Sequence, residues 1–80
     1  METDEQHAFY ANNGAVIKRL EDLPAELKKM DKATFQHHVN AEKNDFANWI
    51  RDVFNNKKLA DSIAKAKSKT TMSKKIKEAL

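Results

Sequence analysis

The chain contains no cysteine and has one glycine and one proline among its 80 residues. Without cysteine it can form neither a disulfide, a thiolate metal site nor a cysteine nucleophile, and this composition fits a reducing compartment, so we expect a cytoplasmic protein. A single glycine excludes a glycine-rich phosphate-binding loop. No apolar run approaches the ~20 residues of a membrane-spanning helix. So few turn-forming residues, beside abundant Lys, Ala and Leu, argue against an all-β domain.

Positive charge is concentrated at one end of the chain. Residues 1–56 carry seven Lys/Arg and ten Asp/Glu, whereas residues 57–80 carry eight Lys and two acids. The net charge of +3 is therefore the sum of −3 and +6. A run of this sign is either a solvated helix face or a surface that attracts polyanions.

The large apolar side chains gather between residues 44 and 54. They are Phe46, Trp49, Ile50, Val53 and Phe54. This i, i+3, i+4, i+7, i+8 spacing predicts a helix with one wide apolar face, capped by Asn44 or Asp45. We expect the rest of the chain to pack around this helix, with Trp49 at the centre of the core. The face is wide enough for part of Trp49 or Phe54 to border a surface groove.

The remaining patterns predict a hairpin and four further helices. Residues 1–7 are charged and lack an apolar period, so we expect disorder there. Asn13-Gly14 between apolar runs predicts a β-hairpin of residues 8–12 and 15–19 joined by a type I′ turn. Apolar residues at helical spacing predict helices at 23–30, 32–39 and 58–67, the first capped by Asp22, and a last one marked by Met72 and Ile76.

The predicted fold class is mainly α: a short N-terminal β-hairpin followed by about five short helices in a compact irregular bundle. Residues 8–80 form one small domain, with basic C-terminal helices over residues 57–80. In size and number of helices it resembles the small five-helix folds of sterile-alpha-motif type.

Two segments carry a family resemblance. Phe35-Gln36-His37-His38-Val39-Asn40 followed by Asn44-Asp45-Phe46-Ala47-Asn48-Trp49-Ile50 resembles the "HHVN … NDFANWI" signature of an uncharacterised small-domain family of archaea and ultra-small bacteria. The upstream residues Phe9-Tyr10, Asn13-Gly14 and Leu20 extend the resemblance. The resemblance covers about residues 8–64 and excludes the Lys-rich end. It implies a fold but no activity, because that family has no assigned function.

The polar residues around the histidines are the first candidate site. His37 and His38 are adjacent, so on a helix they point about 100° apart and cannot chelate one metal together; we expect neither a metal nor a cofactor. The structural interpretation is a half-buried His38 bonded to a backbone carbonyl or to the Asn40 and Asp45 region. The functional alternative is a ligand notch, lined by His38, Asn40, Asp45 and Trp49, that holds a peptide or a small polar ligand.

The second candidate is a phosphate-contacting surface. Its lysines would be Lys58, Lys65, Lys69 and Lys75. Such charge contacts a nucleic-acid backbone without reading sequence, but the region has no arginine and no aromatic residue for base stacking.

No set of residues predicts catalysis, and we expect no enzymatic activity. The first hypothesis is therefore a non-enzymatic intracellular module that binds a protein or peptide. The alternative is weak, sequence-non-specific nucleic-acid binding through the Lys-rich helices. The sequence leaves the partner and the oligomeric state open.

Overall fold

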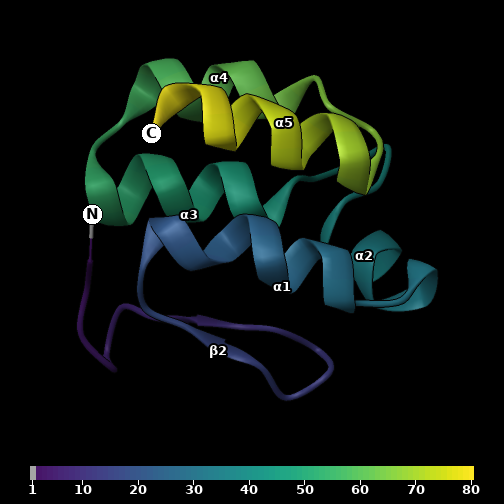
Figure 1. The fold of residues 1–80 in the computed structure, drawn as a ribbon, viewed down its shortest axis with the longest axis horizontal. Helices are drawn as coiled ribbons and strands as arrows, with labels where there is room; N and C mark the ends of the chain where they lie inside the picture. Colours follow the sequence, from purple (N-terminus) through teal and green to yellow (C-terminus); the bar gives the residue numbers. More distant parts are fainter. Residues whose placement is uncertain (1) are drawn as a thin grey trace.

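A short antiparallel hairpin precedes five α-helices in the computed structural model, which describes residues 2–80 (Figure 1). The elements are β1 (Phe9–Tyr10), β2 (Val16–Ile17), a 3-10 turn η1 (Leu20–Asp22), α1 (Leu23–Lys29), α2 (Lys32–His38), α3 (Asp45–Phe54), α4 (Lys57–Ala64) and α5 (Lys69–Ala79). This architecture confirms the predicted fold class. Within residues 2–80, no helix combines the length and the apolar character needed to cross a bilayer.

The helices pack in pairs around one core. α3 lies against α4, and α1 lies against α5, which also contacts α4. In Figure 1 the hairpin lies at the bottom of the molecule and α4 at the top, with α1 and α3 between them. The largest fully buried side chains come from β2, from η1 and from the helices with their caps: Ile17, Leu20, Leu23, Leu27, Met30, Phe46, Ile50, Ile63, Met72 and Ile76.

Short polar side chains begin four of the helices. Each accepts a hydrogen bond from a first-turn backbone N–H that has no partner within its helix. The caps are Asp31 for α2 (2.8 Å), Asn44 for α3 (3.0 Å), Asn56 for α4 (3.1 Å) and Ser68 for α5 (3.2 Å). Asn44 rather than Asp45 therefore caps the central helix, which leaves the Asp45 carboxylate available for other contacts.

Two predicted helix ends are wrong. Asp22 does not cap α1 with its side chain. Asp22 is the last residue of η1, so its backbone has a helical conformation (φ −86°, ψ −14°) and not the extended one that capping needs. α4 ends at Ala64 instead of residue 67. Ala66 nevertheless stays buried, so its apolar spacing reflects core contact outside the helix.

The hairpin is at the predicted place but has a different turn. Phe9 pairs with Ile17 and Tyr10 with Val16. A type I′ turn needs positive φ at two central residues, yet only Gly14 has it there (φ 91°). The Gly14 N–H donates to the Ala11 carbonyl (2.9 Å), and the Ala11 N–H donates to Ala15 (2.9 Å). These bonds describe a three-residue loop that ends in a left-handed glycine.

Gly14→Val is expected to destabilise the protein by about 1–2 kcal/mol, because a β-branched residue is strained at positive φ. A new Cβ would meet no heavy atom within 4 Å, so backbone strain and not a clash sets the cost. Gly14→Asn is the matched control, since asparagine tolerates this conformation. Urea unfolding measures both variants. Equal losses for valine and asparagine would contradict the strain argument.

Residues 2–7 lie beside the hairpin. The Thr3 N–H donates to the Lys18 carbonyl (2.7 Å), and Glu2 forms an isolated β-bridge with Arg19. The His7 carbonyl accepts a hydrogen bond from the Trp49 indole (2.7 Å). The disorder expected for residues 1–7 stays a prediction. Met1, the first residue of that segment, lies outside the described residues.

Candidate functional site

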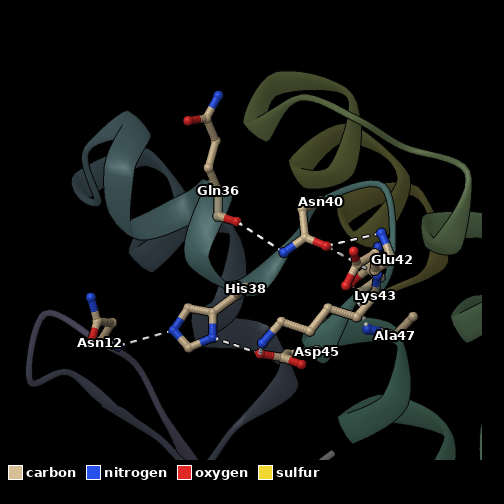
Figure 2. A network of polar contacts seen from close by, with 9 residues as sticks. Asn12, Gln36, His38, Asn40, Glu42, Lys43, Asp45 and Ala47 are labelled. Atoms are coloured by element: carbon tan, nitrogen blue, oxygen red, sulfur yellow. Dashed lines mark hydrogen bonds and ion pairs between the residues drawn. The ribbon is translucent and has the colours of Figure 1, made fainter.

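His38 is a buried histidine that joins three elements. It is the last residue of α2 and is 6% exposed. Its Nε2 accepts a hydrogen bond from the backbone N–H of Asn12 in the hairpin loop (2.9 Å), and its Nδ1 lies 2.9 Å from Asp45 Oδ2 at the start of α3 (Figure 2). Because a backbone N–H can only donate, Nε2 must be unprotonated. The neutral ring therefore carries its proton on Nδ1 and donates it to Asp45.

Aromatic rings enclose this imidazole. The ring centroids of Phe9 and Phe46 lie 4.9 Å and 5.5 Å from that of His38. A carboxylate that holds a histidine tautomer also occurs in catalytic triads, where Nε2 is free to take a proton. In His38 both ring nitrogens already have protein partners. The bond to Asp45 is one that the structural interpretation predicted, whereas the backbone partner is an N–H and not a carbonyl, and the ring is buried and not half-buried.

Asp45 is held ionised by its neighbours. Burial raises the pKa of this carboxyl, but the hydrogen bonds from His38 and from Lys43 (3.1 Å), together with the charge of Lys43, outweigh it and bring the pKa below the ordinary value. Its side chain remains 29% exposed. Asp45 therefore links α2, the following loop and α3 as an acceptor of two hydrogen bonds.

Acid should weaken the fold partly through Asp45. A carboxyl whose pKa is lower in the folded state contributes its full stabilisation above its unfolded pKa and loses it as the pH falls through the folded pKa. The loss should therefore occur below about pH 4, the ordinary range of aspartate. Melting temperatures of the wild type and of Asp45→Asn at several pH values measure it. The wild type should lose more stability on acidification, and parallel curves would contradict this prediction.

Asn40 shapes the loop before α3. Its Oδ1 accepts hydrogen bonds from the backbone N–H groups of Glu42 (2.9 Å) and Lys43 (3.2 Å), and its Nδ2 approaches the Gln36 carbonyl (3.4 Å). Figure 2 shows these contacts leading back to α2 and into the loop, and not toward the His38 imidazole. This is a turn-forming role that asparagine often has. Among the four predicted notch residues, His38 and Asp45 are hydrogen-bonded to each other. Asn40 bonds to other residues and does not contact this pair through a hydrogen bond.

Trp49 contacts Phe9 and Phe54. Its ring centroid is 5.7 Å from that of Phe9 and 5.0 Å from that of Phe54, and its Nε1 donates to the His7 carbonyl. It is 8% exposed, so it belongs to the edge of the core. Phe54 is the partly exposed member of this aromatic face. Within residues 2–80, no group of three or more His, Asp or Glu side chains converges to hold a metal ion.

The four candidate lysines do not share one surface. Lys58 and Lys75 border a groove between α4 and α5, whereas Lys69 lies at the opposite side of α5, toward α1 and α2. Lys65 follows the end of α4. A straight line of Lys58, Lys65 and Lys69 requires one continuous helix, but α4 ends at Ala64 and α5 begins at Lys69.

A wide, open groove lies between α1 and α5, with a volume of about 1000 Å³. It is called the α1–α5 groove below, and its lining residues are Glu21, Pro24, Ala25, Lys28, Lys69, Thr70, Ser73, Lys74, Lys77, Glu78 and Leu80. Sequence reasoning selected only Lys69 among them. The two sides of the groove are about 40 residues apart in the chain, so no local spacing could reveal it. Leu80, at one side of the groove, is 54% exposed.

Comparisons of the chain with protein-family models, with curated proteins and with solved structures give no match. The resemblance carried by residues 37–40 and 44–50 therefore stays a prediction. In the structure those two segments hold His38, Asn40 and Asp45, whose side chains bond to the chain itself. Functional proposals must rest on the surface and its chemistry.

Proposed function

We propose that this chain is a non-enzymatic module that binds another protein or a peptide, and that the α1–α5 groove is its docking surface. The observation that carries the proposal is the composition of this groove, whose lining combines the exposed residues Ala25 and Leu80 with four lysine side chains. Concave apolar surfaces with a polar rim are typical of peptide-binding sites. A cytoplasmic setting is part of the same proposal.

The chemistry of the His38 region supports a non-enzymatic role. A general base needs a nitrogen within reach of a substrate proton. Nε2 of His38 instead accepts the Asn12 N–H, and Nδ1 contacts Asp45. These contacts favour a structural role for His38, and they favour the surface grooves as the place where a partner binds.

Site-specific photo-cross-linking tests the proposal. A photoreactive side chain at the exposed Ala25 should capture a partner in an extract of the source cells, and excess unmodified chain should compete. The control carries the same group at Asp52, which is exposed on α3 away from the groove. The captured protein, once purified, should bind the wild type and not Ala25→Glu. Identical products from both positions, or none from Ala25, would contradict the proposal.

Nucleic-acid binding is the second candidate. In the part of the chain that the structure describes, none of the eight lysines of residues 57–80 forms an ion pair with a carboxylate. Lys69 donates to the Met30 carbonyl, whereas the other seven ammonium groups have no hydrogen-bond partner in the described chain and are free to contact phosphates. Their distribution over different faces of α4 and α5 limits how many can contact one duplex at the same time.

Replacing Lys65, Lys69 and Lys75 together by Gln should weaken any binding to duplex DNA and flatten its salt dependence. Each phosphate contact contributes a log–log slope of about −0.9, and such contacts carry no base information. Fluorescence anisotropy across a salt series, with two unrelated duplexes, measures both effects. Because the lysines are dispersed, we expect weak binding with a shallow slope. No binding at low salt, where screening is weakest, would eliminate this candidate.

A further inference from the structure

The α1–α5 groove is lined by residues of two packed helices. α1 and α5 are packed against each other, with contacts among the most extensive between helices in the fold, and Figure 1 shows that they run in opposite directions. A groove between two packed helices follows their axes, and a third helix can lie along it at the usual interaxial distance of about 8–10 Å. Peptide helices dock in such grooves through an apolar stripe of i, i+3, i+4 and i+7 residues.

Apolar atoms are available in the groove to receive such a stripe. On the α1 side Pro24 and Ala25 lie in the first turn, and Ala25 is exposed. At the other side Leu80, which follows α5, is 54% exposed. The inward residues Met72 and Ile76 of α5 are fully buried in the core, so Leu80 is not needed there. A docked apolar side chain would remove both Ala25 and Leu80 from water.

The rim of the groove is positive. Lys28 stands at the end of α1, while Lys74 and Lys77, three residues apart on α5, are neighbours on one helix face. In the described chain these three lysines have no ion pair. Lys69 donates to the Met30 carbonyl and adds a fourth positive charge. The carboxylates of Glu21 and Glu78 balance part of it.

We infer that the α1–α5 groove binds an acidic amphipathic helix of a partner protein, with leucine-like residues on one face and carboxylates beside them. This inference rests on the proposed function and names its partner class. Carboxylates would meet Lys28, Lys74 and Lys77, and the apolar face would cover Ala25 and Leu80. Packing of two copies of this chain groove against groove fits less well, because it would bring the lysines of one copy against those of the other. A duplex would leave the apolar atoms exposed to water.

Fluorescence anisotropy with three labelled synthetic helices tests the inference. The acidic peptide has leucines at i, i+3, i+4 and i+7 and glutamates elsewhere; a second peptide has the same composition in scrambled order; a third has lysines for the glutamates. The acidic peptide should bind about tenfold or more tightly than the other two, with an affinity that falls as salt rises. Equal binding of the scrambled peptide would overturn the amphipathic-helix assignment.

Matched charge reversals locate the site. Lys74→Glu with Lys77→Glu should weaken binding of the acidic peptide by about tenfold or more, because attraction becomes repulsion. Lys58→Glu with Lys65→Glu changes the net charge equally outside this groove and should change affinity by about twofold or less. Ala25→Glu, a single exposed change, gives an independent loss should the double variant fold poorly. Equal losses of affinity in the two double variants would show that the peptide responds only to the net charge of the protein, and they would overturn the assignment of the groove.

The two proposals fail differently. A partner captured through Ala25, together with no binding of the acidic peptide, would overturn the partner class and leave the interaction module standing. Peptide binding that shifts amide resonances of the hairpin and not of α1 and α5 would overturn the groove. Displacement of the acidic peptide from the groove by duplex DNA, at equal charge concentration, would show that the surface binds polyanions in general. That result would overturn the assignment of an acidic helix as the partner.

Discussion

Phe46→Ala is expected to be the most destabilising truncation in this chain, at about 3–5 kcal/mol. The ring is fully buried at the start of α3. It stacks on Phe9 with centroids 4.5 Å apart and on Phe35 at 6.3 Å, and it approaches His38 at 5.5 Å. One side chain therefore holds the hairpin, α2 and α3 together. A loss of this size approaches the lower end of the total stability of a folded domain, which is about 5–15 kcal/mol.

Denaturant unfolding measures this prediction, with the fluorescence of Trp49, the single tryptophan, as the signal. Phe46→Leu is the control, because it keeps most of the apolar volume and should cost less than half as much. The sequence places Trp49 at the centre of the core, whereas the structure places it at the edge, 8% exposed against 0% for Phe46. Trp49→Ala, followed by circular dichroism, should therefore be the milder truncation. The opposite order would contradict the assigned core.

His38→Ala is expected to cost about 2–4 kcal/mol, the second largest effect. It leaves the Asn12 N–H and the Asp45 carboxylate without their histidine partner, and an unsatisfied partly buried group costs about 1–3 kcal/mol. It also opens a void between Phe9 and Phe46. His37→Ala is the matched control: the neighbouring residue is an exposed histidine, so its loss should stay within about 0.5 kcal/mol.

The tautomer of His38 checks the same contacts without a mutation. Nitrogen NMR at neutral pH should find the proton on Nδ1, because Nε2 accepts the Asn12 N–H. In His38→Ala, the amide of Asn12 should lose its protection against hydrogen exchange. A proton on Nε2, or equal costs for the His37 and His38 variants, would contradict the structural role of His38.

Local features of the fold follow from the sequence. Asp31, Asn44 and Ser68 each cap a helix within three residues of themselves, so a short window contains both the donor and the acceptor. Apolar spacing likewise places Phe46, Ile50 and the other core residues of α3 on one face. The hairpin turn shows the limit of such signals: Asn13-Gly14 marks its position, but the pairing of Ala11 with Ala15 decides which residue takes positive φ.

The roles of the candidate site residues depend on contacts distant in sequence. Asn44 caps α3, as its spacing predicts, yet its Nδ2 also donates to the Ile63 carbonyl of α4, which lies 19 residues away (3.1 Å). His38 takes its tautomer from Asn12, 26 residues earlier. That donor is a backbone N–H, which every residue except proline carries, so no side-chain pattern could have identified it.

The sequence by itself determined the helices, most of their caps and the hairpin, because each depends on residues a few positions apart. The tertiary structure alone decided that Phe46 and not Trp49 is the centre, that His38 is enclosed with both nitrogens bonded, and that the candidate lysines are dispersed. It also created the α1–α5 groove, whose apolar and basic residues come from helices about 40 residues apart. Packing sets which faces meet, and this information is not contained in the period of any single helix.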